Sequence, residues 1–309
     1  MSSAPASAPA NAQVHATEAL LLAMATIWGV NFAVMKYGTQ VLDPLAYNGV
    51  RMTLATAVLL VVIRSQRARL PAWRDIRALM LLGVLGHGIY QGFFILGLAR
   101  TRAGTASLVI ASSPGVIAIV GRMLGVERVS PRAIGGIVLS VAGIAFVIFG
   151  SSQSSEGEAS VVGDLLILVA VVVWAFYTSL LKPYTERIDG VQIAGWTLVG
   201  GVVPMLLFAA PALVHTEWRS ITALTWGAIA FSGVMAMVVA YSFWYRGVRV
   251  IGSTRTAMFG NLQPIVALAV SWPLLGEVPT IWQGVGAAAV MGGLLLTRQP
   301  QMAEPAHGE

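Results

Sequence analysis

Long runs of apolar residues, separated by short polar segments, recur along the whole chain. A helix needs about 20 mainly apolar residues to cross the hydrocarbon core of a bilayer, and the runs come close to that length. The pattern therefore predicts an all-α integral membrane protein with ten transmembrane helices. The expected spans are residues 18–37, 44–64, 77–98, 103–124, 131–150, 161–182, 190–211, 222–245, 253–275 and 280–297.

Three segments of the chain stand outside this apolar pattern. Residues 1–17 are rich in Ala, Ser and Pro and lack the basic residues that begin a secretory signal, so we expect a flexible N-terminal tail. Residues 299–309 are expected to form a C-terminal tail, and residues 151–160, rich in serine and glutamate, an outer linker. The chain then divides into a first five-helix repeat over residues 18–150 and a second over residues 161–298.

The two halves share the order of a few characteristic residues. Shifts of 146 to 150 positions align Trp28 with Trp174, Lys36 with Lys182, Pro114 with Pro264, Glu127 with Glu277 and Gly143 with Gly293. Each half holds five spans, and because five is odd, two tandem copies must cross the membrane in opposite directions. The sequence therefore predicts two inverted-topology five-helix repeats, an arrangement found in many secondary transporters.

The composition agrees with a membrane protein and narrows its chemistry. Of the 309 residues, 57% are hydrophobic and 10% are charged, whereas soluble domains carry about 25% charged residues. The absence of cysteine excludes disulfide scaffolds and thiolate metal sites. The net charge of +6 does not indicate nucleic-acid binding, because most basic residues fall in loops on one side of the predicted topology. By the positive-inside rule, both termini are cytoplasmic, and we expect a multi-pass protein of the bacterial cytoplasmic (inner) membrane.

Acidic residues inside a span are costly and usually functional, but all 13 acidic residues fall in loops, tails or span ends. Proton exchange for cationic drugs, intramembrane aspartyl proteolysis and divalent-metal transport are therefore disfavoured. The sequence also lacks the H-E-x-x-H zinc pattern, so it predicts no catalytic group, no metal site and no cofactor. Glu127 and Glu277 are expected to cap the fifth and tenth spans through the helix macrodipole.

Arg51 is the one basic residue well inside a predicted span, about 10 Å below its outer end at 1.5 Å per residue. We expect a structural arginine that bonds nearby carbonyl groups and extends its charged end outward. The alternative is a counter-charge for a substrate carboxylate.

His87 is the only histidine in a predicted span and is expected near the middle of the membrane. Tyr90, Gln91 and Phe94 follow at i+3, i+4 and i+7, so the four share one helix face. We infer that this face lines a substrate cavity and that His87 contacts the substrate and titrates. The alternative is a buried neutral histidine bonded to a neighbouring helix.

Pro114 and Pro264 fall near the middle of corresponding spans. Each removes a backbone donor and kinks its helix, which frees carbonyl groups. Transporters place such interrupted helices around a binding site, although proline kinks also serve packing alone. The polar neighbours that we include in the predicted site are Ser112, Ser113, Asn261 and Gln263.

Two tryptophans, Trp28 and Trp174, lie near the middle of corresponding spans. Each could stack on an aromatic substrate or fill a gap between helices. The neighbours about one turn later that we include in the predicted site are Asn31, Tyr177 and Thr178. Tyr241 lies deep enough to join them, whereas Trp244 and Tyr245 approach the cytoplasmic end, where an interfacial aromatic belt is expected.

Several short motifs carry a resemblance to a known family. They are Trp28-Gly29 with Asn31 and Phe32, the lone Arg51, and the hairpins Leu124-Gly125-Val126-Glu127 and Leu274-Leu275-Gly276-Glu277. Over about residues 18–298 the chain resembles the drug/metabolite transporter superfamily, in particular its ten-span EamA-type exporters, and is nearest in character to the bacterial aromatic-amino-acid exporters. The resemblance implies secondary transport, usually efflux of metabolites such as amino acids. It also implies a central cavity lined by the first, third, fourth, sixth, eighth and ninth spans.

Together these observations predict a secondary transporter that exports small metabolites, above all amino acids and aromatic ones among them, by alternating access. We expect a small-molecule substrate and the lipid bilayer as its partners, and no nucleic acid. The sequence does not determine the oligomeric state, and a monomer is compatible with it. The alternatives are an uncoupled facilitator and an efflux carrier for drugs or other metabolites. A membrane-embedded enzyme is disfavoured because the spans offer no nucleophile–base pair.

Overall fold

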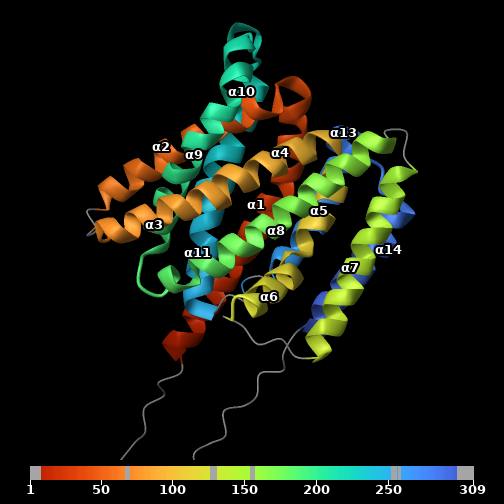
Figure 1. Ribbon diagram of the computed structural model, residues 1–309, viewed down its shortest axis with the longest axis horizontal. Coiled ribbons are helices and arrows are strands. Elements are labelled where there is room, and N and C mark those ends of the chain that lie inside the picture. Colours follow the sequence, from red (N-terminus) through yellow and green to blue (C-terminus); the bar gives the residue numbers. More distant parts are fainter. Residues whose placement is uncertain are drawn as a thin grey trace, which may run out of the picture.

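The computed structural model describes residues 8–66, 70–125, 131–153, 157–251, 256 and 259–297, and every regular element in them is helical. These helices form ten rods, where a rod is one long helix or a series of shorter helices that follow one another end to end. Figure 1 shows how they are arranged. In the first half the elements are α1 (Ala8–Val41), α2 (Pro44–Ser65), α3 (Trp73–Gly83), η1 (Val84–Ile89), α4 (Tyr90–Arg100), α5 (Ala103–Ala111), α6 (Ser113–Met123) and α7 (Pro131–Ser152). In the second half they are α8 (Gly157–Thr185), α9 (Gly190–His215), η2 (Trp218–Ser220), α10 (Ala223–Ala230), η3 (Phe231–Val239), α11 (Ala240–Ile251), η4 (Gly260–Leu262), α13 (Gln263–Leu275) and α14 (Ile281–Thr297).

Most of these rods have the length and polarity of membrane spans. Seven stretches are long and apolar enough to cross a bilayer, namely Gln13–Val41, Pro44–Ser65, Trp73–Arg100, Ala103–Met123, Ser160–Thr185, Gly190–His215 and Ala223–Ile251. Ile134–Gly150 and Gly260–Leu275 are apolar but shorter, and α14 has 17 residues. Large apolar side chains face outward, as Leu207 and Phe208 do with exposures of 72% and 74%. The predicted all-α membrane protein with ten helices is confirmed.

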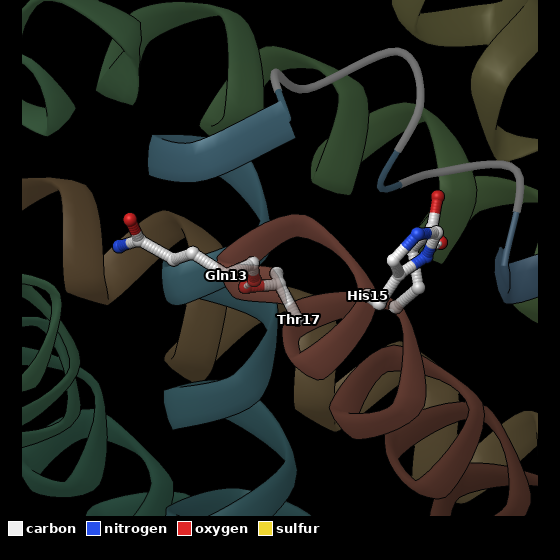
Figure 2. A network of polar contacts seen from close by, with 4 residues as sticks. Gln13, His15 and Thr17 are labelled. Atoms are coloured by element: carbon white, nitrogen blue, oxygen red, sulfur yellow. Dashed lines mark hydrogen bonds and ion pairs between the residues drawn. The ribbon is translucent and has the colours of Figure 1, made fainter. Parts of the chain in front are cut away.

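The helices begin and end beyond several expected boundaries. α1 begins at Ala8, so residues 8–17, expected as a tail, are helical, which agrees with the high helix propensity of their alanines. Local polar contacts support this turn, because Thr17 Oγ1 donates to the Gln13 carbonyl at 2.8 Å and His15 Nδ1 lies 3.4 Å from Glu18 (Figure 2). α7 and α8 likewise extend into the expected linker over residues 151–160. Residues 1–7, 154–156 and 299–309, and Glu127, lie outside the described residues.

Equivalent helices of the two halves pack together and run in opposite directions. The second helices, α2 and α9, and the fifth helices, α7 and α14, form such pairs, and Figure 1 shows α7 and α14 side by side at one edge of the molecule. The start of one helix meets the end of the other at Gly49–Ala209 and Ile63–Gly195 in α2–α9, and at Gly136–Gly293 and Gly150–Trp282 in α7–α14. Antiparallel packing of equivalent helices is the inverted topology that the odd number of spans predicts.

Within the residues that the structure describes, four rods are interrupted, and the interruptions come in matching pairs. In the third rod of each half, a π-helical segment (η1 or η3) joins two α-helices. In the fourth rod, the regular helix restarts at Pro114 of α6 and Pro264 of α13, each in the first turn. The carbonyl of Ile110, which precedes the first of these breaks, accepts a hydrogen bond from Ser113 Oγ. The expected proline interruptions are therefore present in both halves.

The third rod of the first half touches α9 through bare backbone. A Cβ added at Gly83 would overlap the carbonyl oxygen of Thr197, and one added at Gly200 would overlap that of Met80. Such close approach brings hydrogen-bonding and dispersion partners together in a lipid environment, where burial from water no longer drives association. The α3–α9 contact therefore admits no side chain at either glycine.

Glu277 caps a different helix from the one expected. Its two carboxylate oxygens accept from the backbone N–H groups of Ala103 and Gly104 at 3.0 and 3.3 Å, at the start of α5. The first turn of α14 is closed instead by Thr280 and Gln283, whose side chains bond each other's backbone N–H groups. Glu277 thus uses the helix macrodipole as predicted, but across the interface between the halves.

Candidate functional site

A central cavity of about 130 Å³ is lined by residues of both halves. Its wall comes from α1, α2, α4, α5 and α6 in the first half, and from α8, η3, α11, η4 and α13 in the second. These are the first, third and fourth rods of each half, which the family resemblance implies, together with α2. The second rod was not expected to contribute and does so through Arg51.

Most of the predicted site residues lie in this wall. They are Trp28, Asn31, Tyr90, Gln91, Phe94, Ser113, Pro114, Trp174, Tyr241, Asn261 and Gln263. The wall does not include His87, Ser112, Tyr177, Thr178 and Pro264. The structure thus brings together residues that are far apart in the sequence, while their contact with a substrate stays a prediction.

Six aromatic side chains that line the cavity form a continuous series of ring contacts, which we call the aromatic circuit. Its ring-centroid distances are 5.8 Å for Phe32–Phe94, 5.7 Å for Phe94–Tyr90, 5.0 Å for Tyr90–Trp174, 6.3 Å for Trp174–Tyr241 and 5.3 Å for Tyr241–Trp28. Trp28 and Phe32, the two ends of this series, stand one turn apart on α1. These spacings suit attractive aromatic pairs. The circuit offers ring edges and faces to an apolar or aromatic group.

A hydrogen bond holds Trp28 in the aromatic circuit. Its indole Nε1 donates to the carbonyl of Ala236 at 2.9 Å, within the π-helical η3. The ring also lies 5.8 Å from Trp244, which lines the cavity. The expected place of Trp244 in an interfacial belt is therefore wrong, because the residue packs inward against α1.

Arg51 does not extend outward as expected. Its side chain is buried, with 1% exposure, and its Nε donates to Asn48 Oδ1 at 2.7 Å while Nη2 donates to Gln91 Oε1 at 2.6 Å. Two side-chain amides hold the guanidinium in the cavity wall, in place of the carbonyl groups that we expected. The cost of a charge inside a span favours the alternative, a counter-charge for a substrate carboxylate, which stays a prediction.

His87 lies behind the cavity wall rather than in it. The residue is 1% exposed, and its ring makes edge contacts with Tyr177 and Tyr241 at 5.6 and 5.7 Å. Neither ring nitrogen has a hydrogen-bond partner among the described residues. The expected shared face fails because His87 lies in η1 whereas Tyr90 lies in α4, and a π-helical turn takes up an extra residue and shifts the side-chain period.

Tyr177 is also buried behind the wall. Its hydroxyl lies 3.5 Å from that of Tyr245, and both residues are less than a tenth exposed. Tyr245 stacks on Tyr241 at 6.2 Å, so its expected place in an interfacial belt is wrong. These two tyrosines support the aromatic circuit from outside.

Several polar contacts join the rods around the start of α5. Lys36 Nζ donates to the carbonyl of Ala99 at 3.0 Å, Thr101 Oγ1 donates to Asp164, and Glu277 caps α5. These bonds join α1, α4, α5, α8 and the α13–α14 hairpin. Among the described residues, no group of three or more His, Cys, Asp or Glu side chains could hold a metal ion.

Comparison with known proteins gives consistent matches along the chain. The EamA-like transporter family matches residues 16–149 and 161–299. The uncharacterized transporter YyaM of Bacillus subtilis (strain 168) is 26% identical over 283 residues, which cover 89% of this chain and 91% of the relative. A probable terminal-alkyne amino-acid exporter of Streptantibioticus cattleyicolor is 28% identical over 279 residues, covering 90% and 91%. One solved crystal structure superposes with a TM-score of 0.65 at 17% identity, covering 91% of this chain and 96% of the other, and shares the fold.

Proposed function

Because the chain belongs to the EamA-like transporter family, we propose that this membrane transporter exports small metabolites, above all amino acids and aromatic ones among them, by alternating access. The family consists of transporters and not of enzymes. The direction, the substrate and the mode of transport are the parts that we propose.

The observation that carries the proposal is the aromatic circuit around a cavity with neutral amide groups. An apolar side chain gains contact with the rings, and Asn31, Gln91, Asn261 and Gln263 offer hydrogen bonds. Such a lining suits a zwitterion with an apolar side chain. A phosphate-bearing solute suits it less, because phosphate recognition favours several basic side chains and Arg51 is the only basic residue among the described residues of the wall. The similarity to a probable amino-acid exporter supports the same class.

The arrangement of the rods supports alternating access. Inverted repeats with interrupted helices at the interface allow one half to rock against the other around a fixed site. Here the interruptions before Pro114 and Pro264 both border the cavity. The two halves can therefore open the same site to either side of the membrane.

Flux measurements on purified protein in liposomes test the proposed function. We expect labelled L-phenylalanine to move at a rate that saturates with concentration, and unlabelled aromatic amino acids to compete with it. Protein-free liposomes give the baseline, and a proton gradient of either sign shows whether transport is coupled. A flux that rises linearly with concentration indicates a channel, and no flux of any amino acid contradicts the substrate class.

The proposed orientation, with both termini in the cytoplasm, predicts which loops react from outside. The chain has no cysteine, so single cysteines can be introduced at will. We expect Ser152→Cys, at the exposed end of α7, to react with a membrane-impermeant maleimide in intact spheroplasts. Gln66→Cys, at the exposed end of α2, is the matched control and should react only after permeabilisation. The reverse pattern would place the linker in the cytosol and overturn the orientation.

A further inference from the structure

Arg51 carries a positive charge in the cavity wall. It lies in the third turn of α2, is 1% exposed, and borders the same cavity as the aromatic circuit. Its two hydrogen bonds go to neutral amide oxygens of Asn48 and Gln91. Ion pairs such as Arg187–Asp75 and Arg249–Asp189 form elsewhere, and none within the described part of the chain includes Arg51.

A buried charge without a counter-charge is strongly unfavourable, because desolvation is then not offset by attraction. Among the described residues these two bonds use two of the five N–H donors of the guanidinium, so further donors stay available to a ligand. Asn48 and Gln91 hold Nε and Nη2 and thereby fix the plane of the fork. A fixed fork of this kind matches the two oxygens of a carboxylate.

Asn31 supplies a second group with opposite character. Its Oδ1 is buried without a hydrogen-bond donor among the described residues, whereas its Nδ2 donates to Met35 Sδ at 3.1 Å. Asn31 lines the same cavity as Arg51. The wall thus offers a cationic guanidinium and a carbonyl acceptor beside the aromatic circuit.

We propose that Arg51 binds the carboxylate of the transported solute, with Asn31 accepting from its ammonium group and the aromatic circuit holding its apolar side chain. This rests on the proposed function in taking an amino acid as the solute. The assignment also requires that a ligand carry a carboxylate, which the fold alone does not require. Amines and uncharged aromatic compounds then bind poorly.

Ligand binding to the purified protein tests this assignment. Trp28 and Trp174 face the cavity, so quenching of tryptophan fluorescence reports occupancy. The probes are L-phenylalanine, 3-phenylpropanoate, which lacks the ammonium group, and phenethylamine, which lacks the carboxylate. We expect phenethylamine to bind the wild type at least about 30-fold more weakly than L-phenylalanine, as is usual when a buried charge loses its partner.

Variants separate the charge of Arg51 from its packing. We expect Arg51→Gln to weaken both carboxylates at least about 30-fold and to leave phenethylamine unchanged, and Arg51→Lys to weaken them less. Arg100→Gln is the matched control, because the Arg100 side chain bonds the Leu96 carbonyl at the exposed end of α4. It should leave all three affinities unchanged.

The outcomes distinguish this proposal from the proposed function. Equal binding of phenethylamine and L-phenylalanine, or undiminished carboxylate binding by a folded Arg51→Gln, overturns the proposal, even if amino acids are transported. If Arg51→Gln does not fold, Arg51→Lys and the wild-type probe series decide. If no amino acid crosses the liposome membrane but 3-phenylpropanoate binds in an Arg51-dependent way, the amino-acid function falls and the carboxylate site stands.

Discussion

Replacing Gly83 with alanine is expected to lower the unfolding temperature of the protein sharply. The added Cβ would overlap the carbonyl oxygen of Thr197, and neither backbone can move without separating α3 from α9. Overpacking of this kind costs about 1–3 kcal/mol and in severe cases more, a large part of the stability of a typical domain, about 5–15 kcal/mol. Gly200→Ala, which meets the carbonyl of Met80, should have a similar effect.

The measurement is thermal unfolding of the purified protein in detergent, followed by size-exclusion fluorescence after heating. Gly227→Ala on α10 is the matched control, because nothing lies within 4 Å of its added Cβ. We expect the control to unfold at the wild-type temperature and both packing variants to unfold far below it or to fail to accumulate. Wild-type unfolding temperatures in all three variants would contradict the close contact between α3 and α9.

Trp174→Ala is expected to reduce kcat/KM for L-phenylalanine by about 100-fold or more. Trp174 contacts Tyr90, Tyr177 and Tyr241 with ring-centroid distances of 5.0, 5.0 and 6.3 Å, so its loss opens the aromatic circuit at a central member. Truncating a buried aromatic at a binding hot spot costs about 2–4 kcal/mol, and a loss of about 3 kcal/mol corresponds to about 100-fold. Trp174→Phe keeps a ring at this position and should retain most of the activity.

Initial rates in liposomes, at matched protein content, check this prediction. Trp272→Ala on α13 is the control, because that side chain is 56% exposed on the surface of the molecule and does not belong to the aromatic circuit. The unfolding temperature of each variant shows whether a lost rate reflects lost folding. Equal rates for Trp174→Ala and Trp272→Ala, in folded proteins, would remove Trp174 from the site.

The rods of the fold follow from the sequence because a membrane span is a local property. A run of about 20 apolar residues has few other solutions in a bilayer, since every backbone polar group must be bonded within the helix. Pro114 and Pro264 mark interruptions for the same local reason. The helix at residues 8–17 was not predicted, because an alanine-rich polar segment can extend a helix beyond the membrane without any apolar run.

The side-chain environment of the cavity was less accessible from the sequence. A regular helical period places His87 on the face of Tyr90, but His87 lies in the π-helical η1, which breaks that period and contains no proline that would indicate the break. The Arg51 side chain does not extend outward because it bonds Gln91, which lies on another rod. Glu277 caps α5 rather than its neighbour in sequence. All three depend on how distant rods pack, which no local pattern contains.

The hydrogen bond between Trp28 and η3 has a consequence for the proposed alternating access. Its counterpart by repeat symmetry would join Trp174 to η1, yet among the described residues the Trp174 indole donates no such bond, while Trp28 donates to Ala236. The two repeats therefore differ in this contact within a single molecule. Under the proposed alternating access, we expect Trp174 to donate to η1 when Trp28 releases η3, because the two halves would then exchange their arrangements.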